Sequence, residues 1–304
     1  MGDARLYGAI ELGGTKTVLA IGTADGSILA RRRIPTRAPE AVIADAAAFF
    51  GASGFALAGL GVGAFGPIVI DRSAPGFGQL CQTNKPGWSG FDLVAGLETA
   101  LSLPVQLVTD VGAAAIGEAR LGALRGLRIG LYLTIGTGIG GAIIADGTLL
   151  PALLHPEMGH LALHRLPGDS APSTCRFHDN CAEGLAAGPA IAARFGTPLD
   201  RFQPDAPECL MIADYLGQLC SQLVLTLSPQ RIVLGGGVCH TPGLIGAAQR
   251  AMVRQLGRYG PDAVAGPDYL VAPALGDDAG ITGALLCAAD QRSAACESAS
   301  IVSR

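Results

Sequence analysis

With 304 residues, the chain is long enough for two compact lobes, because a single hydrophobic core stops growing at about 250 to 300 residues. Apolar residues make up 49% of the sequence and charged residues 15%, a balance that excludes a disordered chain. The formal net charge of -4 provides no positive field for a phosphate backbone, so we expect no nucleic-acid partner.

The first predicted elements are short strands interrupted by glycine turns. Residues 1–5 are polar and no charged-then-apolar leader follows them, so we expect a cytoplasmic protein with no membrane partner. Residues 6–33 contain three apolar runs, separated by the turn GGTK and by an Asp-Gly pair that suits a tight hairpin. Residues 129–150 repeat this order around the turn GTGIGG. The repeat predicts two duplicated lobes, each beginning with a three-stranded meander.

Further strands and helices alternate after each meander. Strands are predicted for residues 57–65 and 105–109 and near residues 231 and 269. Helices are predicted for residues 39–50, 111–124, 181–194, 207–227, 243–256 and 279–289. The alternation predicts a mixed α/β sheet in each lobe. We place the first lobe at residues 1–110 and the second at residues 111–304, with the last helix, about 279–290, able to pack back on the first lobe.

Three glycine-rich turns can aim backbone N–H groups at phosphate, because glycine allows a sharp turn and a close approach of the chain. They contain Gly13, Gly14, Thr15 and Lys16; then Gly136, Thr137 and Gly138; then Gly235, Gly236 and Gly237. The second turn matches G-x-G-x-x-G, but a strand follows where that dinucleotide motif opens a helix. Two of the three turns lie in the repeated meanders, which favours phosphate binding over three unrelated hairpin turns.

Asp110 stands between the apolar strand 105–109 and a helical run, at a carboxyl edge where α/β sheets bind ligands. Taken alone, an aspartate in this context is more often a helix N-cap, which contributes ~1 kcal/mol. The functional alternative is a base that accepts the proton of a substrate hydroxyl during phosphoryl transfer. The neighbouring motifs must decide between these two interpretations.

Histidine and cysteine gather in one segment, which holds four of the five histidines between residues 155 and 178. Nothing places the eight cysteines in an oxidising compartment, so we expect reduced thiols. The spacing C-x2-H-x2-C of Cys175, His178 and Cys181 is typical of zinc, and one upstream histidine would complete a tetrahedral set. By spacing alone that histidine is His155, His160 or His164. A closed four-ligand site is structural and would brace the loop 155–183.

The motifs E-L-G-G-T-K, I-G-T-G-I-G-G and L-G-G-G-V, in this order within two meander lobes, resemble those of the actin-like (ribonuclease H-like) ATPase superfamily. Within it the chain resembles the ROK (repressor, open reading frame, kinase) family over roughly residues 6–290. The resemblance implies an α/β fold of two duplicated lobes with a nucleotide and sugar cleft between them. It also implies that the first two turns hold the ATP phosphates and that the third lies beside the adenosine.

The same resemblance assigns individual residues. T-D-V-G-A-A-A-x-G-E is similar to the family segment that bears the catalytic aspartate, which makes Asp110 the base. E-M-G-H resembles the family's E-x-G-H motif, whose histidine binds zinc, and so selects His160. Glu11 replaces the aspartate usual in the first motif, and whether this longer carboxylate contacts Mg²⁺ is left open. N-x-P-G-W matches the family's sugar loop, and the sugar-side residues implied are Asn84, Asp110, Glu157, His160 and Glu183.

The resulting prediction is an ATP-dependent hexose kinase that uses Mg²⁺, carries structural Zn²⁺ and forms a homodimer. The pattern C-x2-H-x2-C-x-E departs from the family's three-cysteine pattern and looks like the bacterial fructokinase branch, so the predicted reaction converts D-fructose to fructose 6-phosphate. Glucokinase, mannokinase and N-acetylhexosamine kinase are the alternatives within the family. A sugar-sensing transcriptional regulator is disfavoured, because the strand pattern begins by Leu6 and leaves no room for a DNA-binding domain.

Overall fold

The computed structural model describes residues 5–83, 85–150, 155–257, 259–260 and 262–290. They form two compact units, one from the residues up to Gly117 together with those from Asp278 onward, the other from Glu118–Asp277. The division falls inside α3 (Asp110–Leu121), somewhat beyond the boundary predicted after Asp110. The physical reason is that Ala113 packs in an apolar cluster of the first unit, whereas Glu118 is hydrogen-bonded to backbone of the second.

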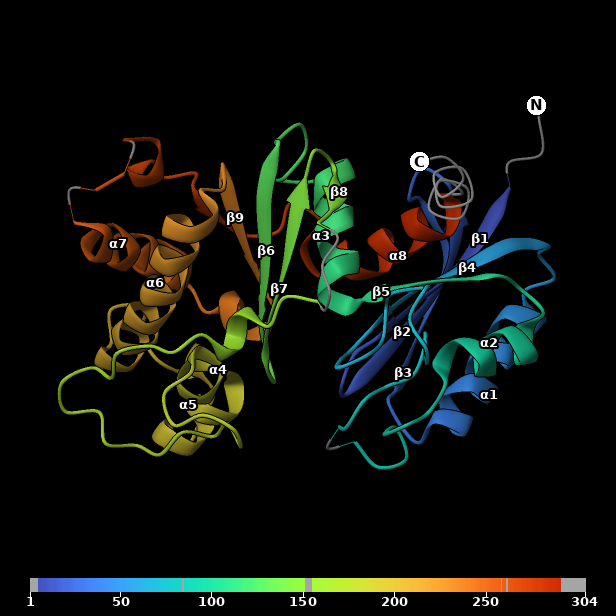
Figure 1. The fold of residues 1–304 in the computed structure, drawn as a ribbon, viewed down its shortest axis with the longest axis horizontal. Coiled ribbons are helices and arrows are strands. Elements are labelled where there is room, and N and C mark those ends of the chain that lie inside the picture. Colours follow the sequence, from blue (N-terminus) through green and yellow to red (C-terminus); the bar gives the residue numbers. More distant parts are fainter. Residues whose placement is uncertain (1–4, 84, 151–154, 258, 261, 291–304) are drawn as a thin grey trace, which may run out of the picture. The chain divides into compact units, whose positions relative to one another are not determined.

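The first unit is built on a five-stranded sheet in the order β3-β2-β1-β4-β5 (Figure 1). β1 (Leu6–Leu12), β2 (Lys16–Thr23) and β3 (Ile28–Pro35) form the predicted antiparallel meander. β4 (Leu57–Ala64) runs parallel to β1, and β5 (Val105–Thr109) runs parallel to β4. The meander therefore continues into parallel strands, whose carboxyl ends share one edge of the sheet.

Helices cover both faces of this sheet. α1 (Pro39–Ala52) and α2 (Leu93–Leu101) pack on one face, and α8 (Ala279–Ala289) packs on the other against β1, β2 and β4. The sequence pattern did not predict α2, a nine-residue helix that begins where the Asp92 side chain accepts a hydrogen bond from Ala95 N. Trp88 is 1% exposed and donates its indole N–H to Arg37 O (2.8 Å), so this tryptophan belongs to the core.

The second unit repeats the topology of the first, which confirms the predicted duplication. Its sheet has the order β10-β9-β6-β7-β8 (Figure 1). β6 (Ile129–Ile135), β7 (Ile139–Ala145) and β8 (Thr148–Leu149) form an antiparallel meander, and β9 (Arg231–Gly235) and β10 (Leu270–Val271) add parallel strands. β8 and β10 are shorter than the apolar patterns predicted, with two residues each.

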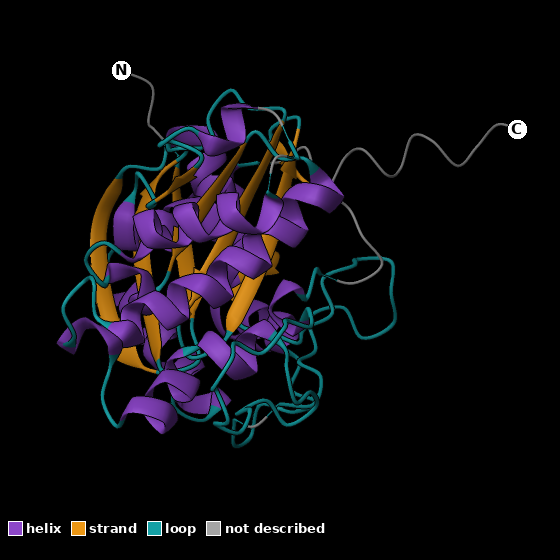
Figure 2. Ribbon diagram, turned by 90° about the vertical axis from the view of Figure 1, so that its left-hand side faces the viewer, coloured by secondary structure: helices purple, strands orange, loops and turns teal. Residues whose placement is uncertain are grey.

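Four helices pack with one face of this second sheet into a single core: α4 (Ala182–Ala186), α5 (Gly188–Phe195), α6 (Pro207–Leu227) and α7 (Leu244–Leu256). Figure 2 views the molecule from the side of α6 and α7. The single helix predicted over residues 181–194 is two helices, because Ala187 is extended and Pro189 cannot donate the backbone hydrogen bond that would continue α4.

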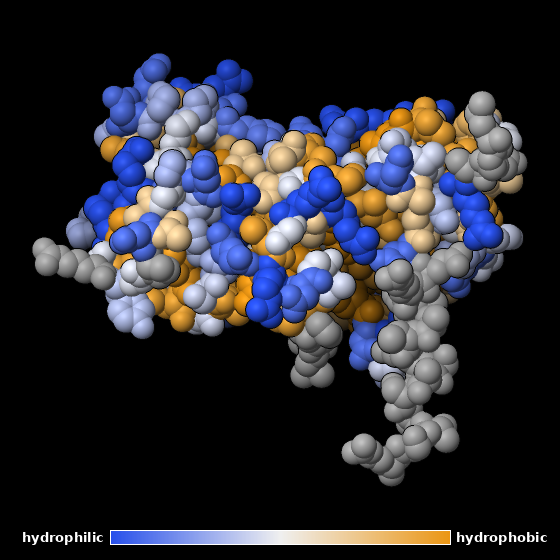
Figure 3. All heavy atoms as spheres, turned by 90° about the horizontal axis from the view of Figure 1, so that it is seen from above, coloured by the Kyte–Doolittle hydropathy of each residue, from blue (hydrophilic) through white to orange (hydrophobic). Residues whose placement is uncertain are grey.

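α6 is long and apolar enough, by length and composition, to cross a membrane. Of its most apolar stretch, 61% is buried inside the second unit, which is the property of a core helix. Apolar and polar side chains are intermixed on the face seen in Figure 3. Among the described residues, the most exposed large apolar side chain is Phe177 at 79%, in the loop that also carries Cys175 and His178.

Candidate active site

The parallel strands of the first unit bring several predicted site residues to one sheet edge. The register pairs Leu12 of β1 with Ala64 of β4, and Ala64 with Thr109 of β5. The first glycine turn and Asp110 each follow directly on one of these strand ends. The first glycine turn and Asp110, which lie far apart in the sequence, are therefore at the same edge of the sheet, the edge at which open α/β sheets bind ligands.

Asp110 begins α3, but the hydrogen bond typical of an N-cap comes from its neighbour. Thr109 Oγ1 accepts the backbone N–H of Gly112 (3.0 Å), three residues on. Asp110 Oδ1 accepts the N–H of Val111 (2.7 Å), the very next residue, which is a different geometry from capping. Thr109 therefore provides the N-cap hydrogen bond that was the alternative role of Asp110. The Asp110 side chain is half-buried at the sheet edge.

Glu11, near the end of β1, lies in the electrostatic field of this carboxylate. Its burial, followed by the negative charge of Asp110, raises the pKa of Glu11 from 4.5 to about 7, although Lys16 and Arg31 act in the opposite direction. The side chain is therefore partly protonated near neutral pH. A bound divalent cation would favour the ionised form and reverse this effect.

The raised pKa makes the stability of the folded chain depend on pH. Between pH 4.5 and about 7 the folded state holds a proton on Glu11 that the unfolded state has lost. The stability that protonated Glu11 contributes is therefore fully present below pH 4.5 and is lost as the pH rises through about 7. A displacement from 4.5 to about 7 corresponds to on the order of 3 kcal/mol. The free energy of unfolding of Glu11→Gln, relative to that of the wild type, should therefore be larger at pH 8 than at pH 5 by about this amount.

Urea unfolding without Mg²⁺ at the two pH values measures this difference. Glu40→Gln, at an exposed position of α1, is the matched control and should leave the pH dependence of the wild type unchanged. Equal pH dependence in Glu11→Gln and the wild type would show that Glu11 ionises normally in the folded chain.

The first glycine turn is closed by backbone contacts and approached by a lysine. Gly13 N donates to Lys16 O (3.1 Å), and Thr36 Oγ1 donates to Gly13 O (2.7 Å). Thr15 and Lys16 are exposed. A methyl group added to Gly14 would lie 3.2 Å from Lys85 Cε and 3.5 Å from Nζ, so the Lys85 side chain lies against the turn. Sequence reasoning had no signal for this contact, and the adjacent Asn84 lies outside the described residues.

The second glycine turn contacts α4 and α5, which follow the predicted metal ligands. Gly136 N donates to Gly138 O (2.9 Å), and Gly188 N, at the start of α5, donates to Gly136 O (2.7 Å). Glu183 Oε2 accepts the backbone N–H of Ile139 (2.9 Å). Glu183 therefore connects the predicted metal-binding loop to a predicted phosphate turn, a contact that the sugar-binding interpretation of this residue did not include.

The third turn, Gly235–Gly237, packs on the end of β6. Gly236 has φ +88°, and a side chain there would come 2.5 Å from Ile135 O, so only glycine fits. Ile135 directly precedes the second turn, so the second and third turns adjoin. A residue that sequence reasoning passed over supports this region: the fully buried Glu118 accepts backbone N–H groups of Ala123, Ala274 and Leu275 (2.6, 3.1 and 2.8 Å).

Four residues bring their ligand atoms together in the second unit: His160, Cys175, His178 and Cys181. All four atoms lie within 4.8 Å of one another, and three sulfur-to-Nδ1 distances, from Cys175 to both histidines and from Cys181 to His160, are 3.7 Å. Bond lengths of about 2.3 Å to sulfur and about 2.05 Å to nitrogen put these atoms about 3.6 Å apart in a tetrahedral zinc site. Donor set and spacing thus fit Zn²⁺.

The other two candidate histidines lie outside this cluster. His155 Nε2 is 2.8 Å from Glu157 Oε1, and its Nδ1 is buried without a hydrogen-bond partner among the described residues. His164 uses its backbone N–H and carbonyl to contact the Gln218 side chain (2.9 and 3.0 Å). Glu157 precedes the short turn Met158–His160 and is exposed. The structure thus groups His160, and neither alternative, with the other three ligands.

Comparison with known proteins gives consistent matches over almost the whole chain. The ROK family model matches residues 7–291. The fructokinase of Pediococcus pentosaceus is 37% identical, covering 93% of this chain and 97% of that protein. The fructokinase of Zymomonas mobilis is 38% identical, with coverage of 94% and 97%. The crystal structure of a ROK hexokinase from Thermus thermophilus has a TM-score of 0.75 at 32% identity, and covers 94% of this chain and 98% of that one.

Proposed function

This chain belongs to the ROK family, and from that premise we propose that it is an ATP-dependent hexose kinase that converts D-fructose to fructose 6-phosphate. One observation carries the proposal: the aligned ends of β1 and β5 place the first glycine turn and Asp110 at one sheet edge. A kinase needs a phosphate-binding turn and a proton acceptor, and both leave the sheet there. ATP supplies the transferred phosphoryl group, and Mg²⁺ offsets its negative charge.

Asp110 acts as the general base in this proposal. The Thr109 hydroxyl caps α3, so the Asp110 carboxylate is not needed to begin the helix. The hydrogen bond from Val111 N fixes Oδ1 and with it the plane of the carboxylate. A fixed carboxylate can take the proton from a sugar hydroxyl as that hydroxyl attacks the phosphoryl group. Glu11, with its carboxyl in the field of Asp110, is the proposed contact to Mg²⁺, directly or through water.

Glu157, His160 and Glu183 are the proposed sugar contacts of the second unit. Glu183 Oε2 is occupied by Ile139 N, so the sugar would approach its other oxygen. Carboxylates accept hydrogen bonds from hydroxyl groups, and a site that uses them rejects sugars lacking those hydroxyls. When bound, Zn²⁺ would hold His160, Cys175, His178 and Cys181 in a closed, structural arrangement that keeps this segment ordered.

The fructose assignment has two supports. Relatives that are 37% and 38% identical over more than nine-tenths of the chain are named fructokinases, and the ligand pattern C-x2-H-x2-C-x-E resembles that of the fructokinase branch. A cytoplasmic location and a homodimer are further parts of the proposal. Light scattering of the purified chain would test the dimer.

A coupled ADP-release assay over fructose, glucose, mannose and N-acetylated hexosamines tests the substrate. We expect kcat/KM for fructose to exceed that for each other sugar by at least ~10-fold, because a site that hydrogen-bonds the hydroxyls of one sugar discriminates against sugars that place them differently. ³¹P NMR of the product distinguishes the 6-phosphate from the 1-phosphate. A preference for glucose or an amino sugar would overturn the fructose assignment, and absence of ADP release with every hexose would overturn the kinase proposal.

A further inference from the structure

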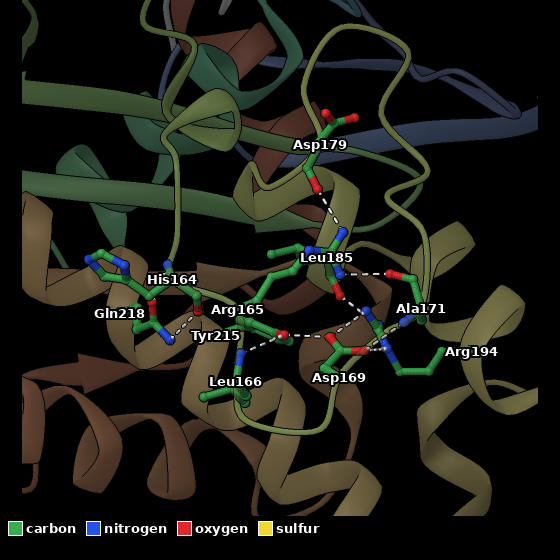
Figure 4. Close-up of polar contacts among 10 residues, drawn as sticks. All are labelled: His164, Arg165, Leu166, Asp169, Ala171, Asp179, Leu185, Arg194, Tyr215 and Gln218. Atoms are coloured by element: carbon green, nitrogen blue, oxygen red, sulfur yellow. Dashed lines mark hydrogen bonds and ion pairs between the residues drawn. The ribbon is translucent and has the colours of Figure 1, made fainter.

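A buried charged network lies at the base of the metal-binding loop, apart from the residues assigned above. Asp169 and Arg194 form an ion pair whose side chains are 2% and 6% exposed. Arg194 Nε donates to Asp169 Oδ1 (3.2 Å) and Nη2 donates to Oδ2 (3.0 Å), a forked contact that fixes both groups (Figure 4). Tyr215 donates its hydroxyl to Oδ2, and Ala171 donates its backbone N–H to Oδ1.

The network keeps Asp169 ionised. Burial by itself would raise the pKa of Asp169, but the hydrogen bonds from Tyr215, Arg194 and Ala171 outweigh burial and hold the pKa below its ordinary value. Burial and the hydrogen bond to Asp169 raise the pKa of Tyr215, so the phenol retains the proton that it donates. A buried ion pair adds little net stability compared with packed apolar side chains, so we look for its effect in the geometry that it enforces.

Helix α6 holds the segment that leaves His160. Tyr215, Gln218 and Gln222 lie on one face of the helix, spaced three and four residues apart. Gln222 Nε2 donates to Ala162 O (3.0 Å). Gln218 contacts both backbone groups of His164, and the Tyr215 hydroxyl accepts the backbone N–H of Leu166 (3.2 Å), as Figure 4 shows. The backbone from residue 162 to 166 is therefore aligned along α6 as far as Asp169, independently of any metal.

Arg194 extends this alignment to the other side of the metal site. Its third nitrogen, Nη1, donates to the Leu185 carbonyl of α4 (2.8 Å). α4 begins directly after Cys181 and carries Glu183. One guanidinium therefore ties the end of the His160 segment to the helix that follows the last metal ligand, as Figure 4 shows for Asp169, Arg194 and Leu185.

We propose that Arg194 and Asp169 are positioning residues that set the geometry of the metal ligands and of Glu183. The part that concerns Glu183 rests on the proposed function; the part that concerns the metal does not. Two backbone segments bring His160 and Cys181 to the site. The side chains of Arg165 and Asn180 join these segments near Cys181, through Asp179 O (2.7 Å) and Leu163 O (3.2 Å), and the Asp169–Arg194 pair joins the end of the first segment to α4. A displacement of this pair changes the distance between the ligands and turns α4, which carries the Glu183 carboxylate.

Arg194→Lys tests this role, because a lysine keeps the charge but cannot span both Asp169 oxygens and the Leu185 carbonyl. We expect the Kd for Zn²⁺, measured by competition with a chromophoric chelator, to rise by ~10-fold or more, the usual scale for residues that orient metal ligands. The KM for fructose should rise by a similar ~10-fold, while kcat changes by less than ~3-fold, since a misplaced binding group weakens ground state and transition state together.

Arg254→Lys is the matched control, because Arg254 forms an exposed ion pair with Asp214 in the same unit. It should leave both Zn²⁺ affinity and KM unchanged. A folded Arg194→Lys variant with the wild-type Kd for Zn²⁺ would overturn the metal part, and one with the wild-type fructose KM would overturn the Glu183 part. Failure of the proposed function looks different: the wild type would phosphorylate no hexose, yet the two proteins would still differ in Zn²⁺ affinity.

Should Arg194→Lys fail to fold, Tyr215→Phe removes only the hydroxyl that bridges Asp169 and Leu166 N. Its Kd for Zn²⁺ is expected to rise, by less than the ~10-fold expected for Arg194→Lys, because one contact that orients the segment is lost while the ion pair remains. An unchanged Kd in a stably folded Tyr215→Phe variant would contradict the inference.

Discussion

Asp110→Asn is expected to lower kcat by ~10² or more, the usual loss when a general base is removed. Asparagine has the same shape, and its carbonyl oxygen can still accept the backbone N–H of Val111, so the start of α3 should not move. Only the capacity to take a proton disappears. The Kd for ATP, measured by calorimetry, should therefore stay close to that of the wild type while steady-state turnover falls.

Asp92→Asn is the matched control for this variant. Asp92 lies in the same unit and caps α2, and asparagine is an equally good cap, so kcat should not change. Thermal unfolding of both variants checks that lost turnover does not reflect lost structure. If Asp110→Asn turned over fructose at nearly the wild-type rate, Asp110 would not be the base, and its place at the sheet edge would be incidental.

Removal of the metal is expected to raise the KM for the sugar by at least ~10-fold and to lower the midpoint of thermal unfolding. The four ligand atoms lie on two chain segments that the metal would hold together, and Glu157 and Glu183 lie within three residues of a ligand. Chelation followed by dialysis, and then by addition of Zn²⁺, should first weaken and then restore sugar binding. Metal analysis of the purified chain identifies the bound ion.

Cys175→Ser provides the same test without a chelator, because it removes one ligand and leaves the other three. Cys81→Ser is its control, since Cys81 is exposed and lies in the first unit. Because Asp169, Arg194 and α6 hold the base of the loop, we expect the far-ultraviolet circular dichroism of Cys175→Ser to resemble that of the wild type. A metal-free sample with full activity would exclude a metal requirement for sugar binding.

Local patterns predicted much of the fold, for a physical reason visible at Asp110. Alternation of apolar residues along a strand and the change to a helical period concern neighbours in the chain, so they placed Asp110 at the junction of β5 and α3. The break between α4 and α5 was missed although Pro189 carries its signal. α2 was also missed, because a nine-residue helix offers few periodic positions and its Asp92 cap resembles an ordinary turn residue.

Spacing in the chain could not select the fourth candidate metal ligand. His155, His160 and His164 are all compatible with C-x2-H-x2-C, and the family motif was needed to prefer His160. In the folded chain His155 contacts Glu157, and the backbone of His164 is held by Gln218, so only His160 reaches the two cysteines and His178. The distance between ligands depends on how α6 aligns the segment after His160, and no local pattern records that alignment.

The succession of strands and helices along the chain, the glycine turns and the set of candidate ligands follow from the types and spacing of residues a few positions apart. The contacts that give these residues their surroundings join positions far apart: Lys85 with Gly14, Glu183 with Ile139, and Asp169 with Arg194. Such contacts depend on sheet register and helix packing, which arise from the whole core at once. Residue types and their order thus indicated the chemistry, and packing determined which of the candidate side chains lie close together.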